Sequence, residues 1–182
     1  MPEPAQLERR TTELLQRLIR FNTVNPPGDE QAAQEFLRET LAAAGFECVT
    51  SGFIEKDFWV KLLGNVSFNP VSALTLATAD RMIGDPLMKG YMVSVMREVL
   101  AIGRAVGVDA DIDPEARIDM ARQLGRFKTS MLQDLEAGKP LEIDGLLAGT
   151  LEIAERAGVQ APFTQTLFGL IRARAISSNQ YR

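Results

Sequence analysis

The chain has 182 residues, of which 46% are hydrophobic and 24% charged, and 20 basic against 24 acidic residues leave a formal charge of −4. This composition is typical of a globular protein with enough residues for one sizeable core or two small ones. Its lysines and arginines form no cluster that would neutralise several adjacent phosphates, so nucleic acid is not an expected partner.

The numbers of histidines and cysteines exclude several kinds of catalytic and metal site. The chain has no histidine, which removes Ser-His and Cys-His catalytic pairs and His-based zinc sites. Its single cysteine, Cys48, cannot form an internal disulfide, as expected in a reducing compartment. The opening "MPEPAQLERR" lacks the apolar core of a signal peptide, and no later stretch is apolar over the length of a bilayer. We therefore expect a cytoplasmic protein that binds no metal and no membrane.

The first 52 residues predict a short helix-turn-helix-strand appendage. Leucines at helical spacing mark residues 5–20 as an amphipathic helix, and "NTVNPPGDE" ends it in a turn. A second helix is expected over residues 29–44, with Gly45 as its C-terminal cap. The segment "FECVT", residues 46–50, predicts a short strand, although a lone strand leaves both of its edges unpaired.

Two carboxylates, Asp29 and Glu30, stand where that second helix begins. A helix N-terminus carries partial positive charge, which stabilises acidic side chains there. We therefore interpret both residues as helix-start carboxylates and not as metal ligands.

From residue 57 onward only helices are expected. Asp-Pro pairs at residues 85–86 and 113–114 each combine a capping carboxylate with a proline suited to the first helical position. Gly107 and Gly125 then close the two helices. The other predicted helices cover residues 58–75, 129–137, 141–157 and 162–175. The larger part of the chain is thus predicted to be mainly α, ending in a frayed tail, "SSNQYR".

One predicted helix carries polar residues in an otherwise apolar segment. In "FWVKLLGNVSFNPVSALT", residues 58–75, the side chains of Lys61, Asn65 and Asn69 recur at every fourth position and so share one face. Pro70 removes a backbone donor from this helix. Taken alone, a helical lysine is more often solvated or snorkelling than functional, and Asn-Pro often only ends a helix.

A second segment, "KTSMLQDLEAGKPLEID", residues 128–144, completes a recognisable pattern. With "MREVLAIGRAVGV", residues 96–108, between them, the two segments resemble the C-terminal helical domain of the ketopantoate reductase family. That family reduces 2-dehydropantoate to pantoate with NADPH. The resemblance extends from about residue 58 to about residue 175. It implies that residues 53–182 form a helical bundle of the ketopantoate reductase C-terminal type, similar to that of 6-phosphogluconate dehydrogenase.

The resemblance also implies roles for individual residues. Lys61 matches the family's catalytic lysine, which protonates the ketone oxygen as hydride arrives, and Glu142 matches the glutamate that holds substrate and lysine in place. Glu98 matches another acidic position, although an exposed helical carboxylate without a function explains it equally well. The matching substrate-binding positions are Asn65, Asn69 and Ser130. An ammonium that donates a proton, with amides and a hydroxyl that give directional hydrogen bonds, suits the reduction of a small keto acid.

The family's cofactor-binding half has no counterpart in the sequence. Complete ketopantoate reductases begin with a Rossmann domain, and neither G-x-G-x-x-G nor G-x-x-x-x-G-K-[ST] occurs here. Residues 14–49 resemble instead the opening of the M20 metallopeptidase family and stop before its His-x-Asp metal motif. We therefore interpret the chain as a chimera joined near residues 52–57, with no cofactor bound by the chain alone.

Three functions from different classes remain. The first is the substrate-binding and acid-base half of an NADPH-dependent 2-dehydropantoate 2-reductase of pantothenate biosynthesis, with 2-dehydropantoate as partner and no activity alone. The second is a non-catalytic helical interaction module, for instance a homodimer, because removal of a partner domain exposes apolar surface. The third, an M20-type hydrolase, would need metal ligands that a chain without histidine does not offer.

Overall fold

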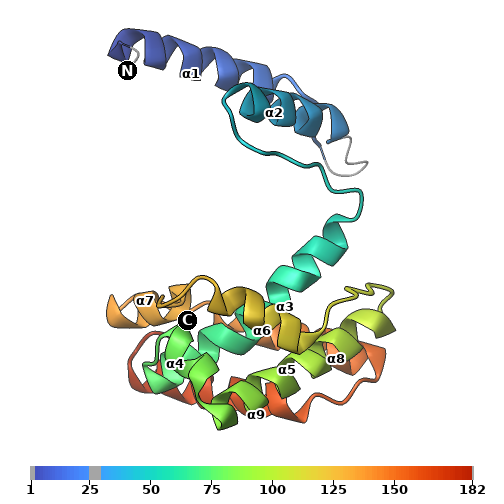
Figure 1. The fold of residues 1–182 in the computed structure, drawn as a ribbon, viewed down its shortest axis with the longest axis vertical. Coiled ribbons are helices and arrows are strands. Elements are labelled where there is room, and N and C mark those ends of the chain that lie inside the picture. Colours follow the sequence, from blue (N-terminus) through green and yellow to red (C-terminus); the bar gives the residue numbers. More distant parts are fainter. Residues whose placement is uncertain (1–2, 25–29, 182) are drawn as a thin grey trace. The chain divides into compact units, whose positions relative to one another are not determined.

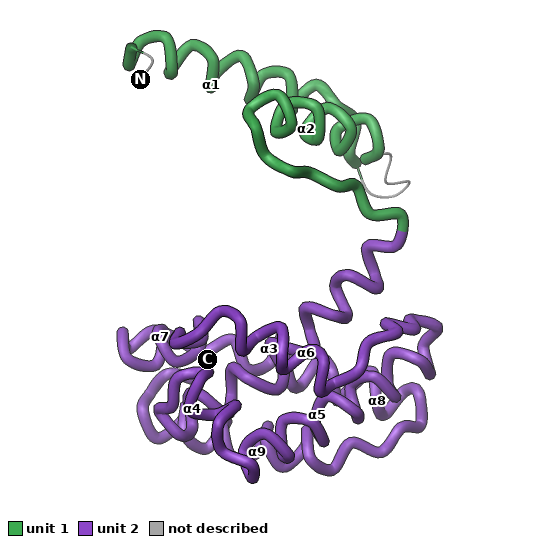
Figure 2. The backbone as a smooth tube through the Cα atoms, viewed as in Figure 1, with its two compact units in different colours: residues 1–52 green, residues 53–182 purple. Residues whose placement is uncertain are grey.

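The computed structural model describes residues 3–24 and 30–181. The chain divides into two compact units, unit 1 (Met1–Gly52) and unit 2 (Phe53–Arg182), which Figure 2 distinguishes by colour. Every regular element among the described residues is a helix (Figure 1). The prediction of a mainly α protein is therefore confirmed.

Unit 1 contains two helices, α1 (Pro4–Ile19) and α2 (Gln31–Ala43), close to the predicted ranges. Gly45 follows α2 with a φ of +88°, a left-handed conformation that glycine adopts without strain. The strand predicted over residues 46–50 is wrong, because these residues form no regular element. A strand needs a neighbour for its backbone hydrogen bonds, and residues with strand propensity alone do not supply one.

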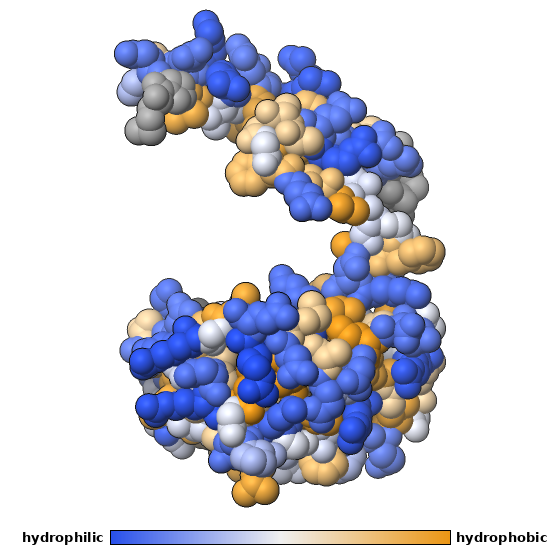
Figure 3. All heavy atoms as spheres, in the orientation of Figure 1, coloured by the Kyte–Doolittle hydropathy of each residue, from blue (hydrophilic) through white to orange (hydrophobic). Residues whose placement is uncertain are grey.

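Packing within unit 1 is sparse. Neither helix contains a buried residue, and Leu15 and Ile19 are 56% and 72% exposed. Apolar side chains are accordingly visible on the surface of this unit in Figure 3. The Phe21 and Phe36 rings lie 5.6 Å apart, and the Arg17 guanidinium lies 4.0 Å from the Phe36 ring centroid. A few side-chain contacts therefore join the two helices in place of a core.

Unit 2 contains the two longest described helices, α3 and α5, and two of its helices begin as the sequence predicts. The Asp85 carboxylate accepts hydrogen bonds from the N–H groups of Leu87 and Met88, and the Asp113 carboxylate accepts one from Ala116. These caps satisfy donors that the first turn of a helix leaves free. The elements are α3 (Ile54–Thr75), α4 (Ala79–Gly84), α5 (Pro86–Ala105), α6 (Pro114–Arg122), α7 (Ser130–Glu136), the π-helix η1 (Asp144–Ala148), α8 (Gly149–Ala157) and α9 (Pro162–Ser177).

Helix α3 lies at the centre of unit 2, where it packs against α5, α7 and α9. Leu63 on this helix is fully buried. The indole Nε1 of Trp59 donates a hydrogen bond to the Val99 carbonyl at 2.9 Å, and a Cβ at Gly103 would collide with the same indole nitrogen. The core thus fixes one side of α3 against α5 and determines which residues of α3 face the other way.

Two parts of unit 2 differ from the prediction. Helix α4 was not expected, because six residues are too short to show a periodic apolar pattern. The helix predicted over residues 141–157 starts later and changes type: Asp144–Ala148 form one π-helical turn before α8. Glu142 therefore precedes the helix instead of lying within its first turn.

The C-terminal residues up to Tyr181 are held in place, so the predicted frayed tail is wrong over residues 177–181, while Arg182 lies outside the described residues. The Gln180 side chain is buried, with 5% exposed. Its side-chain amide nitrogen donates to the carbonyls of Asp134, Leu135 and Lys139, at 3.2, 3.2 and 2.6 Å, and its backbone carbonyl accepts from the Leu141 N–H at 2.9 Å. A buried amide is stable when its polar atoms find partners. Gln180 therefore anchors the chain end beneath the turn that follows α7.

No helix in the described part of the chain is both long enough and apolar enough to cross a membrane.

Candidate active site

The polar face of α3 is the feature around which a site can be built. Lys61, Asn65 and Asn69 stand at successive fourth positions on α3, which continues through Pro70 to Thr75. At about 1.5 Å of rise per residue, the first and last of the three lie roughly 12 Å apart along the axis. Lys61 is exposed, Asn65 is half-buried and Asn69 is buried, with 8% exposed. The face therefore passes from the surface into the bundle along the helix.

Helix α7 meets the buried end of this face. The Asn69 side-chain amide donates to the Ser130 Oγ at 3.5 Å, across 61 positions of sequence. Ser130 is the first residue of α7, and the Thr129 hydroxyl before it caps the helix by accepting from the Leu132 N–H. At 3.5 Å the bond is long and weak, so both side chains retain hydrogen-bonding capacity for another molecule. The structure thus brings two of the predicted substrate-binding residues together.

Lys61 and Glu142 are not joined. Both side chains are exposed, and within the described ranges no ion pair or hydrogen bond connects them. Glu142 stands between the buried residues Leu141 and Ile143, and the π-helix that follows packs against α3. The chain just after Glu142 is therefore packed beside the helix that bears Lys61, while Glu142 itself is exposed to solvent.

Glu98 has a structural task. Its carboxylate accepts hydrogen bonds from the backbone N–H groups of Phe163 and Thr164, at 2.9 and 2.8 Å, and from the Thr164 hydroxyl at 2.7 Å. It thereby caps the N-terminus of α9 from the neighbouring helix α5, where a negative charge is also favoured by the helix dipole. All of these acceptor bonds serve the fold, which supports the structural interpretation of this residue.

The capping contact also affects Tyr91 on α5. The Tyr91 hydroxyl donates to the Phe163 carbonyl at 2.8 Å. Burial, and then the negative charge of Glu98, raise the pKa of Tyr91 above its ordinary value. The phenol is therefore held in its neutral, hydrogen-bond-donating form.

The structure adds one residue that the sequence did not indicate. The Arg117 guanidinium, from α6, lies against the backbone of α3 at Gly64, so that a Cβ on Gly64 would stand 2.7 Å from Arg117 Nη2. The signal in the sequence was the glycine itself, since glycine inside a helix is unfavourable and indicates close approach of another group.

A metal site and a dinucleotide-binding site find less support in the described residues. Within residues 3–24 and 30–181 no group of three or more acidic or cysteine side chains could hold a metal ion. Glu30 is the N-cap residue of α2 but makes no side-chain capping bond, and Asp29 lies outside the described residues. The described residues also contain no β-strand. They therefore do not form the strand-to-helix turn that cradles a dinucleotide pyrophosphate.

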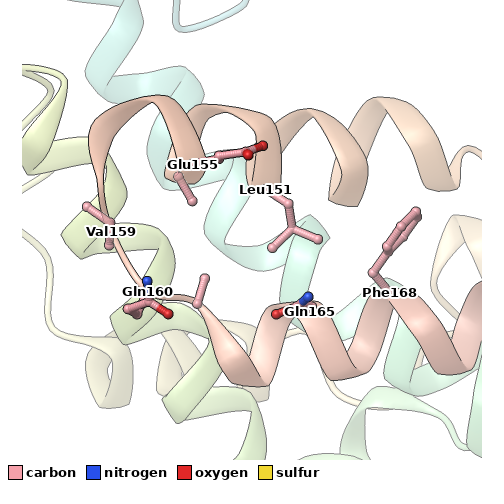
Figure 4. A pocket seen from close by; sticks show the side chains of 8 residues that line it. Leu151, Glu155, Val159, Gln160, Gln165 and Phe168 are labelled. Carbon is pink, nitrogen blue, oxygen red and sulfur yellow. The ribbon is translucent and has the colours of Figure 1, made fainter.

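A hollow between α8 and α9, drawn in Figure 4, has a volume of about 400 Å³. Figure 4 shows the Glu155 carboxylate on α8 and the Gln160 and Gln165 amides on the turn and on α9. None of the predicted site residues is among its lining residues. Its single charged group is a carboxylate, which would repel an anionic keto acid. The polar face of α3 is therefore the better candidate.

Comparison with known proteins defines the class to which unit 2 belongs. The family model described as "Ketopantoate reductase PanE/ApbA C terminal" matches residues 54–175, which include the whole polar face of α3 together with Ser130 and Glu142. The fold is thus that of the helical C-terminal domain of ketopantoate reductases, and the chain belongs to this family.

Individual relatives agree with the family model. A 2-dehydropantoate 2-reductase from Mesorhizobium japonicum is 36% identical over 162 residues, which are 89% of this chain and 50% of that protein. The crystal structure of a PanE/ApbA family ketopantoate reductase from Ralstonia eutropha JMP134 matches with a TM-score of 0.72 at 30% identity, over 80% of this chain and 49% of that one. The crystal structure of a Ralstonia solanacearum MolK2 protein assigned to the ketopantoate reductases matches with a TM-score of 0.74 at 43% identity. This match covers 81% of this chain and 44% of that one.

The chain therefore spans about half the length of the curated relatives that it matches. The 162 residues aligned with the Mesorhizobium japonicum protein exceed the length of unit 2, so this alignment reaches into unit 1. Part of unit 1 is thus itself similar to a reductase.

Proposed function

We propose that unit 2 is the substrate-binding and acid-base half of an NADPH-dependent 2-dehydropantoate 2-reductase. The observation that carries the proposal is the polar face of α3, which leads from exposed Lys61 to buried Asn69 and meets Ser130 of α7 at its inner end. The keto acid lies along this face, its ketone oxygen near the Lys61 ammonium and its hydroxyl groups near the amides and the Ser130 hydroxyl. Membership of the ketopantoate reductase family supports this assignment of substrate.

Lys61 has the chemistry that the reduction requires. An ammonium hydrogen-bonded to the ketone oxygen stabilises the alkoxide that forms there and gives it a proton. No carboxylate pairs with Lys61 within the described residues, so its ammonium is available to the substrate. Glu142 closes on substrate and lysine when the keto acid binds, because its backbone stands beside α3 while its side chain is open.

The hydride donor must be held by another body of protein. NADPH supplies the hydride in this reaction, and the described residues do not form a turn that would cradle its phosphates. We expect the chain by itself to show no saturable NADPH binding in a fluorescence titration and no NADPH oxidation in the presence of 2-dehydropantoate. Micromolar NADPH affinity would contradict this part of the proposal.

A calorimetric titration of the whole chain with pantoate, the stable product, tests the substrate site. We expect saturable binding that Lys61→Ala weakens. Lys56→Ala is the matched control, since Lys56 is also an exposed lysine of α3 but lies about 140° away around the helix axis. Equal affinities of all three proteins for pantoate would remove Lys61 from the site.

A helical interaction module, as a homodimer, is the second candidate. It is favoured by the exposed apolar residues at the start of α3, where Ile54 and Phe58 are 65% and 59% exposed. A defined dimer together with no response to pantoate would favour it over the reductase half. The resemblance of residues 14–49 to the M20 family and the origin of residues 1–52 by fusion both stay predictions from the sequence.

A further inference from the structure

Arg117 on α6 is a cation for which the described residues supply no counterion. Its Nε is buried and has no hydrogen-bond partner, and within the described part of the chain no ion pair or hydrogen bond engages the guanidinium. A buried N–H without a partner is unfavourable, and a guanidinium offers five donors in a fixed plane. Such a group can donate hydrogen bonds to an anion from outside the chain.

The carboxylates nearest to it in sequence are engaged elsewhere. Asp113 caps α6 by accepting from the Ala116 N–H, Glu115 pairs with Lys89, and Asp119 pairs with Arg122. Each acidic side chain of the Asp113–Arg122 segment therefore has its own partner. None of the three carboxylates within four positions of Arg117 therefore compensates its charge.

The position of the guanidinium is set by Gly64. A Cβ at residue 64 would stand 2.7 Å from Arg117 Nη2 and 3.4 Å from Cζ. A side chain at this position would displace the guanidinium, so the glycine allows it to lie directly on the helix backbone. Gly64 is buried, which places the contact within the bundle and not on its rim.

That contact lies beside the proposed substrate face. Gly64 is three residues after Lys61, so the two positions lie about 4.5 Å apart along the helix axis and about 60° apart around it. Asn69, at the opposite side of the face, meets Ser130 of α7. Lys61 and Asn65 are thus flanked by a guanidinium from α6 and a hydroxyl from α7.

We propose, on the basis of the function proposed above, that Arg117 binds the carboxylate of the 2-oxo acid substrate. A planar guanidinium matches a carboxylate in two parallel hydrogen bonds, whereas an ammonium acts as a point charge. In a 2-oxo acid the carboxylate is bonded directly to the carbonyl carbon, so two neighbouring cations serve two neighbouring oxygen groups. Lys61 takes the ketone oxygen and Arg117 takes the carboxylate.

The experiment compares pantoate with its neutral primary amide as ligands of the whole chain, by calorimetry. Arg117→Met keeps the apolar stem and removes the charge, and we expect it to weaken pantoate binding roughly 10- to 100-fold, the range for a hydrogen bond to a charged group. Its affinity for the amide should change little. Lys61→Ala should weaken both ligands. Arg122→Met, which removes the exposed arginine that pairs with Asp119, is the matched control and should bind pantoate as the wild type does.

Gly64→Ala gives a second, independent variant. The added methyl group would displace only the far end of a flexible side chain, and alanine favours the helix, so the protein should remain folded with an unchanged or higher melting temperature. Pantoate affinity should nevertheless fall. If Arg117→Met and Gly64→Ala bind pantoate as tightly as the wild type, Arg117 is not the carboxylate site although the proposed function stands. If the wild-type chain binds neither ligand, the proposed function itself fails and this inference fails with it.

Discussion

Unit 1 and unit 2 are both helical, yet among the described residues every fully buried apolar side chain belongs to unit 2. In unit 2 the core runs from Trp59 to Ala175 and includes fully buried residues of α3, α5, α7 and α9. In unit 1 neither α1 nor α2 contains a buried residue. Helix formation and core formation are therefore separate properties of this chain. Amphipathic patterning marks helices in both units, whereas a functional face such as that of α3 also has a packed bundle behind it.

The largest effect expected from this contrast is on stability. Leu63→Ala empties a fully buried position of α3 and should lower the free energy of unfolding by about 3 kcal/mol. Leu15→Ala makes the same chemical change in α1, where the side chain is 56% exposed, and should cost within about 0.5 kcal/mol. Urea unfolding followed by circular dichroism measures both. Equal losses would mean that unit 1 has a core of its own.

The C-terminal anchor of unit 2 should give the next largest effect. Gln180→Ala removes a buried amide that serves three carbonyls and should lower the free energy of unfolding by about 2 kcal/mol. Gln165→Ala, an exposed glutamine of α9, provides the control and should be nearly neutral. The same urea titration compares them. A neutral Gln180→Ala would show that the chain end frays in solution after all.

A smaller effect is expected in the pH dependence of the free energy of unfolding, and its source is Tyr91 on α5 of unit 2. The pKa of Tyr91 is raised, first by burial and then by Glu98. A raised pKa in the folded state adds stability that is complete below the unfolded value near 10 and is lost as pH rises through the folded pKa. Tyr91→Phe should therefore flatten the fall in unfolding free energy between about pH 9 and pH 11. Identical slopes for the two proteins would show that the raised pKa does not contribute.

Deletion of residues 1–52 should have the smallest effect of all. The helices of unit 2 carry their own caps and apolar stripes, so the remaining chain should melt cooperatively within a few degrees of the whole protein. A thermal melt by circular dichroism measures this. Insolubility or a broad, non-cooperative transition would show that unit 1 covers apolar surface that unit 2 cannot expose.

The sequence predicted what local patterns determine. The Asp-Pro starts at residues 85–86 and 113–114 and the closing glycines mark α5 and α6, because caps act within one helical turn. The strand at residues 46–50 failed because pairing depends on a partner, and the tail at Gln180 failed because its acceptors lie about 40 positions away. These are tertiary contacts that no local pattern contains.

The same division holds for the candidate site. The alignment of Lys61, Asn65 and Asn69 on one face follows from helical periodicity and from family resemblance. The meeting of Asn69 with Ser130, the cap that Glu98 gives to α9, and the place of Arg117 against Gly64 depend on how helices pack. Sequence therefore identified the central helix of the site but not the groups that flank it.

An NMR titration of the whole chain with pantoate tests directly whether unit 2 alone carries a keto acid site on α3. We expect shifts of the side-chain amides of Asn65 and Asn69 and of the backbone amides of Ser130 and Glu142, with saturation at a common ligand concentration. Resonances of residues 3–24 and 30–52 should not move. Shifts confined to unit 1, or no saturable shift at these four residues, would contradict it.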